Sequence, residues 1–257
     1  MLSYQHIYHA GNLADVHKHS LLAWMLDYLT RKEKPVSYLE THAGRALYDL
    51  SDAAARKTGE AAVGIDRAQG WFGTDHPYAR AIAATRAHHG AQAYPGSPWI
   101  ARHLLRPADA LHLAELHPQE QTALGRALGR QAKVYRQDGF DMALSLVPPT
   151  PRRGMILIDP SYERPEDYAR IPRFVAQLDR MWNVGIIAVW YPILTHGAQT
   201  PMVQALAQAH PDALIHEVRF APARPGHRMV GSGMAVLRPP FGLIDEAQRL
   251  GARFATL

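Results

Sequence analysis

Hydrophobic and polar positions along the chain follow two different periods. Apolar residues recur every three or four positions, as on one face of a helix, over 15–29, 66–71, 78–89, 118–129, 140–146, 167–181 and 201–209. Short apolar and β-branched runs predict strands over 35–40, 110–115, 133–136, 155–158, 184–190, 213–220 and 233–237. No further element is assigned after residue 237. Strands that alternate with helices in this way predict an α/β fold, a mostly parallel sheet covered on both faces.

Residues 51–108 interrupt this alternation. They are rich in alanine, histidine and glycine, and they contain helical stretches and a loop at Tyr94-Pro-Gly-Ser-Pro98. We therefore predict a small helical insertion over 51–108, placed between the first two strands. The main domain is then formed by 1–50 and 109–257.

Composition narrows the class of protein. Of the 257 residues, 47% are apolar and 20% charged, as in an ordinary folded protein. The absence of cysteine excludes disulfides, thiolate metal sites and cysteine nucleophiles. The longest apolar run, 184–194, is shorter than the ~20 residues that span a membrane, and the first residues do not resemble a secretory signal. We expect a cytoplasmic protein without a membrane partner, and a monomer, because no exposed apolar stripe is evident.

Residues with useful chemistry follow the predicted strands where each strand ends. They are Glu40–Gly44, Glu115, Asp138-Gly139 and Asp159–Tyr162. Because right-handed crossovers place the carboxyl ends of parallel strands along one edge, these residues are expected to meet there. Each one alone has an ordinary interpretation as a turn or a solvated acid, so the argument depends on their coincidence.

Three of these positions suit a nucleoside-like ligand. The glycine of the Glu40–Gly44 turn allows close approach of the backbone, although the sequence matches neither GxGxxG nor a P-loop. An acid placed like Glu115 can accept hydrogen bonds from two ribose hydroxyls. Asp138 can bind an adenine amine, and the amides beside Gly139 can bind a ring nitrogen.

The segment Asp159-Pro-Ser-Tyr162 is more specific. A carboxylate directly after a buried strand costs free energy unless it is satisfied. The Asp159 carboxylate and the Pro160 carbonyl can accept both protons of an exocyclic amine. Tyr162 can stack on the base that carries this amine, so the three residues predict a site for amine chemistry.

Other polar residues give weaker signals. His6, His9, His17 and His19 crowd the N-terminus without HExxH or interleaved acids, which favours surface and capping histidines over a metal site. Ser97 does not lie in GxSxG, so a nucleophile elbow is not supported.

The net charge of +5 permits a polyanionic partner without requiring one. The last two predicted strands enclose a basic segment, 219–238, whose side chains could contact a nucleic-acid backbone; its basic residues are Arg219, Arg224, His227, Arg228 and Arg238. An ordinary solvated hairpin loop is an almost equally good interpretation.

Taken together, the motifs resemble a known family. In order along the chain they are LSYQHIYHAGNLADVHKH, YLETHAGRALYDL, YPGSPWIARHLL, LHLAELHP, QDGF, RRGMILIDPSYE and AVWYPI. This series resembles the bacterial 23S ribosomal RNA adenine-N6 methyltransferase J family over nearly the whole chain. The N-terminal and YPGSP blocks are distinctive, whereas the DPPY-type motif is shared with many amino-methyltransferases.

The resemblance implies a Rossmann-like methyltransferase sheet with a small helical insertion. It implies S-adenosylmethionine as the cofactor, S-adenosylhomocysteine as the product and no metal. The cofactor-binding residues that it implies are His19, His42, Ser97, Glu115, Asp138, Gly139 and Asp159. Asp159 matches the catalytic acceptor, and Pro160 and Tyr162 complete the catalytic set. Tyr4 matches a residue that contacts RNA, and we add Lys18 and Arg228 as RNA-binding candidates.

The function that the resemblance implies is methylation of the N6 amine of one adenine in 23S ribosomal RNA. The base would be flipped out, and the substrate would be naked or early-assembly RNA. The sequence departs from the family at Ser161, where a second proline is usual, and at Glu40 and Arg45 in the first loop, where Arg45 would crowd the cofactor. Two alternatives stay open: an amino-methyltransferase that acts on DNA or protein, and a non-catalytic RNA-binding protein of the same fold.

Overall fold

A computed structural model describes residues 5–222 and 226–257, so Tyr4 and Arg224 lie outside the described residues. The longer helices are α1 (Leu13–Thr30), α5 (Pro77–His89), α6 (Ser97–Leu104), α7 (Pro118–Leu128), α8 (Gly139–Leu146), α9 (Glu166–Met181), α10 (Thr200–Ala209) and α11 (Leu243–Phe254). Short helices are α2 (Ala53–Thr58), α3 (Glu60–Val63) and α4 (Ile65–Ala68), with 3-10 turns η1 (His6–Tyr8), η2 (Gln69–Trp71) and η3 (Gly129–Gln131). In the parts described, no helix combines the length and apolar character needed to cross a membrane.

The main sheet has seven strands in the order β5-β4-β1-β6-β7-β9-β8. They are β1 (Ser37–Glu40), β4 (Ala110–Ala114), β5 (Lys133–Tyr135), β6 (Gly154–Ile158), β7 (Ile186–Leu194), β8 (Leu214–Arg219) and β9 (Met229–Leu237). The five strands from β5 to β7 are parallel, and the β8–β9 hairpin joins β7 in antiparallel fashion. The predicted Rossmann-like α/β fold is therefore confirmed.

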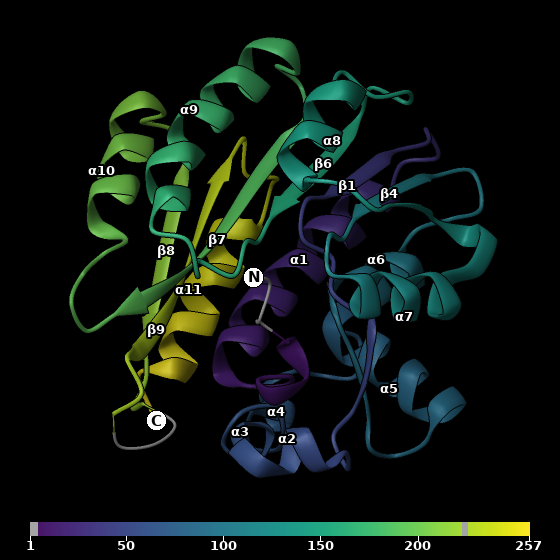
Figure 1. The fold of residues 1–257 in the computed structure, drawn as a ribbon, viewed down its shortest axis with the longest axis vertical. Coiled ribbons are helices and arrows are strands. Elements are labelled where there is room, and N and C mark those ends of the chain that lie inside the picture. The colour runs from purple at the N-terminus through teal and green to yellow at the C-terminus, as the bar shows by residue number, and fades with distance from the viewer. Residues whose placement is uncertain (1–4, 223–225) are drawn as a thin grey trace.

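Helices cover both faces of this sheet (Figure 1). Alternate strand residues enter two separate hydrophobic clusters, as the two-residue period of a strand requires. In β6, Met155 and Leu157 pack with α1, α7 and α11 on one face, whereas Ile156 and Ile158 pack with α8, α9 and α10 on the other. Side chains on both faces of β6 are buried, which explains why its sequence is a continuous apolar run.

Helix α1 is buried along most of its length, and it carries polar side chains into the interior. Asn12 caps its N-terminus, and the Asn12 side chain accepts a hydrogen bond from the Asp15 amide. The helix contacts α5, α6, α11 and β9, so little of its surface faces solvent. Asp15, Lys18 and His19 lie at spacings of three and four residues and share one face of the helix, which points to a cavity described below.

The segment between β1 and β4 contains a second sheet that the sequence pattern did not predict. Its strands β2 (Leu47–Asp49) and β3 (Ala93–Pro95) are antiparallel, and α2 to α5 lie between them in the chain. Tyr94 and Pro95 are therefore in a strand, and Ser97 begins α6 rather than continuing a loop. The insertion over 51–108 and the main-domain boundaries stay predictions.

Other elements differ from the prediction at their ends. Strand β7 (Ile186–Leu194) runs four residues past the predicted end at residue 190, and β9 pairs with it from Ile187 to Leu194. Helix α11 follows the last strand, where no element was predicted. Its buried residues, among them Leu243, Leu250 and Phe254, form a stripe at helical spacing that packs beside α1 and β8.

Candidate functional site

A cavity of about 730 Å³ lies where β1, β4 and β6 end, beside α1. The sequence-predicted residues that line it are Lys18, His19, His42, Ser97, Glu115, Asp138, Gly139, Asp159, Pro160 and Tyr162. Tyr4 lies outside the described residues. Arg228 is exposed and does not line the cavity, although its neighbours His227 and Met229 do. The fold thus gathers ten of the twelve candidate residues around one space.

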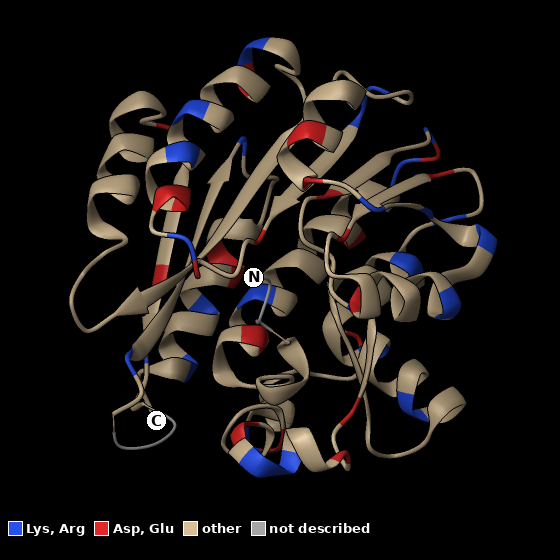
Figure 2. Cartoon of the chain, in the orientation of Figure 1, with Lys and Arg blue, Asp and Glu red and all other residues tan. Residues whose placement is uncertain are grey.

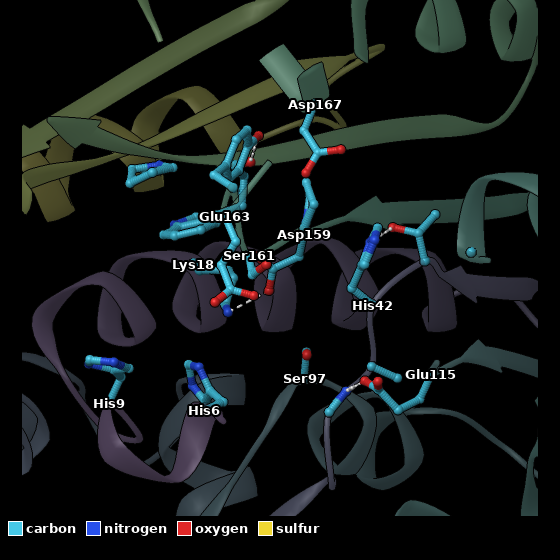
Figure 3. Close-up of a pocket in the computed structure, with 18 of the residues that line it drawn as sticks. His6, His9, Lys18, His42, Ser97, Glu115, Asp159, Ser161, Glu163 and Asp167 are labelled. Carbon is cyan, nitrogen blue, oxygen red and sulfur yellow. Dashed lines mark hydrogen bonds and ion pairs between the residues drawn. The ribbon is translucent and has the colours of Figure 1, made fainter. Parts of the chain in front are cut away.

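The centre of the cavity holds an ion pair between α1 and the end of β6. Lys18 Nζ lies 2.6 Å from Asp159 Oδ2 and 3.3 Å from Asp15 Oδ1, and Figure 3 shows Lys18 and Asp159 pointing toward one another. Burial raises the pKa of Asp159, and Lys18 opposes this rise. Burial lowers the pKa of Lys18, but Asp159 and Asp15 more than reverse this, so the pKa is raised. The ammonium therefore stays charged between two carboxylates.

Asp15 is the second anchor of this cluster. Its Oδ2 atom accepts hydrogen bonds from His6 Nε2 and the Gly11 amide, both at 2.9 Å. Burial raises the pKa of Asp15, but His6, His19 and Lys18 lower it well below its ordinary value of 3.8. Asp15 is consequently a fixed negative charge that holds Lys18 in place.

Tyr162 forms one wall of the cavity in an unusual backbone conformation. Its φ is +55°, in the left-handed region that non-glycine residues rarely adopt and that clusters at functional sites. The hydroxyl of Tyr162 donates a hydrogen bond of 2.6 Å to the carbonyl of Trp190. Trp190 also lines the cavity, and Lys18 Nζ lies 5.2 Å from the centroid of its ring. Tyr162 and Trp190 are in edge contact, with ring centroids 6.1 Å apart, and together they present aromatic surface to the cavity.

The loop after β1 is held between neighbouring strands. The Thr41 amide donates to Leu157 and the Ala43 amide to Ala114. The Gly44 amide, at a φ of +64°, donates a hydrogen bond of 2.8 Å to Glu115. Burial raises the pKa of the Glu115 carboxyl. Glu115 thus fixes the loop and still presents its carboxylate to the cavity.

Gly139 has no room for a side chain. A Cβ atom at this position would lie 1.8 Å from the carbonyl oxygen of Thr41. Asp138 precedes it and caps α8, with Oδ1 accepting from the Phe140 amide at 2.8 Å. Burial raises the pKa of Asp138, but Arg170 reverses this and lowers it. The Asp138 carboxylate therefore caps α8, and the absence of a side chain at Gly139 lets the backbone pack directly against Thr41 in the loop after β1.

Ser97 and Glu40 form a buried pair beneath the cavity. The Ser97 hydroxyl donates to Glu40 Oε1, and the Tyr38 hydroxyl donates to Oε2 at 2.9 Å. Glu40 is fully buried, and burial raises its pKa to about 8. Its carboxyl is thus largely protonated at neutral pH, so Ser97 is oriented by a neutral partner.

His19 and His42 are both neutral. Burial lowers the pKa of His19 to about 3 and that of His42 to about 4. His19 Nδ1 is hydrogen-bonded to Tyr94 at 2.9 Å. Its buried Nε2 atom makes no hydrogen bond among the described residues and lies 3.7 Å from Asp15 Oδ1.

Several expectations are corrected by these contacts. His17 and His19 are buried rather than on the surface, because α1 lies inside the protein.

Two arginines also lie elsewhere than expected. Arg45 does not line the cavity; its guanidinium binds Glu120 at 2.6 Å and 2.9 Å instead of crowding the first loop. Arg238 is not part of a basic loop at this site, because it lies at the other end of β9 and binds Asp179 and the Gly185 carbonyl.

Sequence reasoning missed Asp15 and Trp190 as site residues, and it did not foresee that Glu40 is buried beneath the cavity. The spacing of Asp15 to Lys18 and His19 was an available signal, since it puts the three side chains on one helix face. No comparable signal marks Trp190, which enters the site only because β7 lies beside β6. The described residues contain no group of three or more His, Cys, Asp or Glu that could hold a metal ion.

The charge of the cavity suits a cationic ligand. Seven carboxylate residues line it: Asp15, Glu115, Glu120, Asp138, Asp159, Glu163 and Asp167. Lys18, Arg164 and Arg170 are the only Lys or Arg residues among its described lining. The volume and this acidic lining fit a nucleoside that carries a positive charge.

Comparison with known proteins assigns the chain to a family. The family model described as ribosomal RNA large subunit methyltransferase D, RlmJ, matches residues 33–256. A ribosomal RNA large subunit methyltransferase J from Escherichia coli K12 is 38% identical over 254 residues, which cover 96% of this chain and 90% of the relative. The protein of the same name from Haemophilus influenzae is 36% identical over 261 residues, covering 97% and 92%.

A solved structure agrees with these sequence matches. A protein from Legionella pneumophila, strain Philadelphia 1, superposes with a TM-score of 0.86 at 33% identity, over 96% of this chain and 93% of the other. The resemblance drawn from the seven motifs is thereby confirmed, and the chain belongs to the ribosomal RNA large subunit methyltransferase family described as RlmJ.

Proposed function

We propose that this protein transfers a methyl group from S-adenosylmethionine to the N6 amine of an adenine in 23S ribosomal RNA. Membership of the family supports the ribosomal RNA substrate. The observation that carries the amine chemistry is the position of Asp159 with Pro160 and Tyr162, all lining one cavity at the end of a buried strand.

The cofactor would be held by the loop residues around β1, β4 and α8. Glu115 would accept hydrogen bonds from ribose hydroxyls, and Asp138 and the Gly139 backbone would hold the adenine ring. His19 and Ser97 would complete the lining around the cofactor. When bound, S-adenosylmethionine supplies an electrophilic methyl group on a positively charged sulfur, which the acidic lining accommodates.

Asp159 and Pro160 would prepare the nucleophile. The lone pair of an adenine amine is delocalised into the ring, so the amine is a weak nucleophile. When the Asp159 carboxylate and the Pro160 carbonyl accept its two protons, the nitrogen is held at a fixed orientation. Positioning of this kind can contribute ~7–11 kcal/mol to lowering the barrier. Asp159 or water then takes the proton that the nitrogen loses.

Tyr162 and Trp190 would hold the flipped base. Removing a base from its stack costs a few kcal/mol, and stacking on an aromatic ring offsets part of this cost. The hydrogen bond from Tyr162 to the Trp190 carbonyl keeps the two side chains in fixed relation. Ser161, which replaces a proline, is exposed and leaves the Asp159 and Pro160 backbone in the cavity lining.

Lys18 is better suited to act on Asp159 than on the RNA backbone. It is 4% exposed and its ammonium is engaged by two carboxylates. Direct RNA contacts at Tyr4 and Arg228 stay predictions. We also propose a cytoplasmic monomer that acts on naked or early-assembly RNA and needs no metal, since the displacement requires only the amine and the methyl donor.

The test is transfer of labelled methyl from S-adenosylmethionine to large-subunit ribosomal RNA transcribed in vitro, followed by nucleoside analysis. Label in N6-methyladenosine is expected, and it should be lost in Asp159→Asn while cofactor binding is retained. Label in another nucleoside, or label on DNA or protein but not on RNA, would refute the proposal.

A further inference from the structure

The catalytic cavity is poorly suited to hold RNA by its backbone. Its lining contains more than twice as many carboxylates as Lys and Arg residues, which repel phosphates. Binding of RNA depends largely on cations that neutralise phosphates. Cations outside this cavity are therefore needed to hold an RNA substrate.

A second cavity with the opposite charge lies at the other end of the sheet. Its volume is about 490 Å³, and it lies between the end of α6, the start of β4 and the start of β5. We call it the distal cavity. Its charged lining consists of Arg102, Arg106, Asp109, Arg130 and Lys133. Figure 2 shows several Lys and Arg positions around β4, α6 and α7 on this side of the molecule.

Three of the four cations are available for a ligand. Arg106 is engaged by Asp109 at 3.0 Å and by the carbonyls of Lys32 and Lys34. In the described parts of the chain, no carboxylate lies within ion-pair distance of Arg102, Arg130 or Lys133. Arg130 and Lys133 are exposed, and Arg102 donates only to the side-chain carbonyl of Gln131. The distal cavity thus presents uncompensated positive charge.

One edge strand joins the two cavities. Lys133, at the start of β5, lines the distal cavity, whereas Gln137 and Asp138, just past its end, line the catalytic cavity. Gln137 lies four positions after Lys133, about 13 Å along an extended chain. The exposed Arg136 lies between them. A single RNA chain can span this distance.

We propose that the distal cavity is an RNA exosite, in which Arg102, Arg130 and Lys133 bind phosphates of the ribosomal RNA chain that carries the target adenine. The exosite rests on the proposed function for the identity of the RNA. It places the backbone contacts outside the acidic cavity and leaves that cavity to the cofactor and the flipped base. It also accounts for rRNA binding by a protein whose net charge is modest.

The test compares two double variants that remove the same charges. Arg130→Gln with Lys133→Gln alters the exosite, and Arg56→Gln with Lys57→Gln is the matched control on α2, where both side chains are also exposed. Binding of unmodified large-subunit rRNA is measured by filter retention over a range of salt concentrations. S-adenosylmethionine affinity and methyl transfer at saturating RNA are measured in parallel.

The exosite variant should bind RNA more weakly at 0.1 M salt by on the order of tenfold or more, because two phosphate contacts are lost. The slope of log K against log salt should fall by about 1.4–1.8. The control should keep the wild-type slope. The KM for RNA should rise with the loss of affinity, whereas kcat and cofactor affinity should be unchanged.

A wild-type slope of log K against log salt in the Arg130/Lys133 variant would overturn the exosite, and so would an equal loss of RNA affinity in the control. Displacement of bound RNA by low millimolar inorganic phosphate would also overturn it, because the cavity would then be a site for a free anion. RNA binding is measured without methyl transfer, so the two proposals fail separately. Wild-type protein that binds RNA through these residues but transfers no methyl group would refute the proposed function alone.

Discussion

Lys18 Nζ lies 2.6 Å from Asp159 Oδ2, and this contact joins the first long helix to the end of the sixth strand. The same ammonium contacts Asp15 one helical turn away. Because Asp15 is also held by His6 and the Gly11 amide, the orientation of the Asp159 carboxylate depends on contacts within the N-terminal segment as well as on Lys18.

Lys18→Met should make activity require a higher pH. Lys18 opposes the rise that burial imposes on the pKa of Asp159, so its loss raises that pKa further. The acidic limb of kcat/KM should move upward by about 1–3 pH units. Unfolding should also become easier by about 3–5 kcal/mol, since a buried partner is removed. Lys18→Arg keeps the charge and is the control; an unshifted limb in Lys18→Met would contradict the role given to the pair.

Gly139→Ala should damage cofactor binding through the first loop. The added methyl group would meet the Thr41 carbonyl at 1.8 Å, and backbone atoms must move to admit it. We expect a loss of about 1–3 kcal/mol in the free energy of unfolding and a clear rise in the Kd for S-adenosylmethionine. Gly125→Ala, in α7 with nothing within 4 Å, should be neutral or stabilising. Thermal melting and calorimetric titration of both variants measure this, and equal behaviour of the two would contradict it.

Glu40 should make the protein less stable as the pH rises from its ordinary pKa of 4.5 to about 8. In this window the folded protein binds a proton that the unfolded chain has released, so the free energy of unfolding falls with pH. One group contributes a slope of about 1.4 kcal/mol per pH unit. Glu40→Gln should remove this contribution, and denaturant unfolding at several pH values measures the difference. A difference between wild type and variant that does not change with pH would show that Glu40 does not titrate in this way.

Tyr162→Phe should distinguish the contribution of the Tyr162 ring from that of its hydroxyl. The variant keeps a stacking surface but leaves the Trp190 carbonyl without its 2.6 Å hydrogen bond. We expect a stability loss of about 1–3 kcal/mol with most of kcat/KM retained, whereas Tyr162→Ala should lose most of the activity. Steady-state kinetics with rRNA distinguish the two variants. Similar activity in Tyr162→Ala and the wild type would exclude base stacking on this ring.

The parallel strands and the edge that carries the site follow from local patterns. Buried parallel strands such as β6 read as apolar runs, and Asp159 stands out because it ends one. Glu115 and Asp138 were predicted by the same rule, and the structure brings all three to one cavity. Their roles in binding and catalysis stay predictions.

The features that the sequence did not predict depend on contacts between segments that are far apart in the chain. Lys18 and Asp159 are 141 residues apart, and only the packing of α1 against the sheet brings them together. A buried Glu40 looks like any strand residue until Ser97 is seen to bond with it across 57 residues. The strands β2 and β3 are three residues each, too short for a clear alternating pattern, and they form because each is the other's partner.

The ion pair of Lys18 also bears on how the protein is synthesised. Lys18 leaves the ribosome long before Asp159, and strand β1 needs β6 as well as β4 at its sides. Before β6 has emerged, burial of α1 would leave the Lys18 ammonium without the Asp159 carboxylate. This cost disfavours early packing of α1 against the sheet. Nascent chains that end before residue 159 should therefore expose α1 to proteases, and the helix should become protected only once the sixth strand is in place.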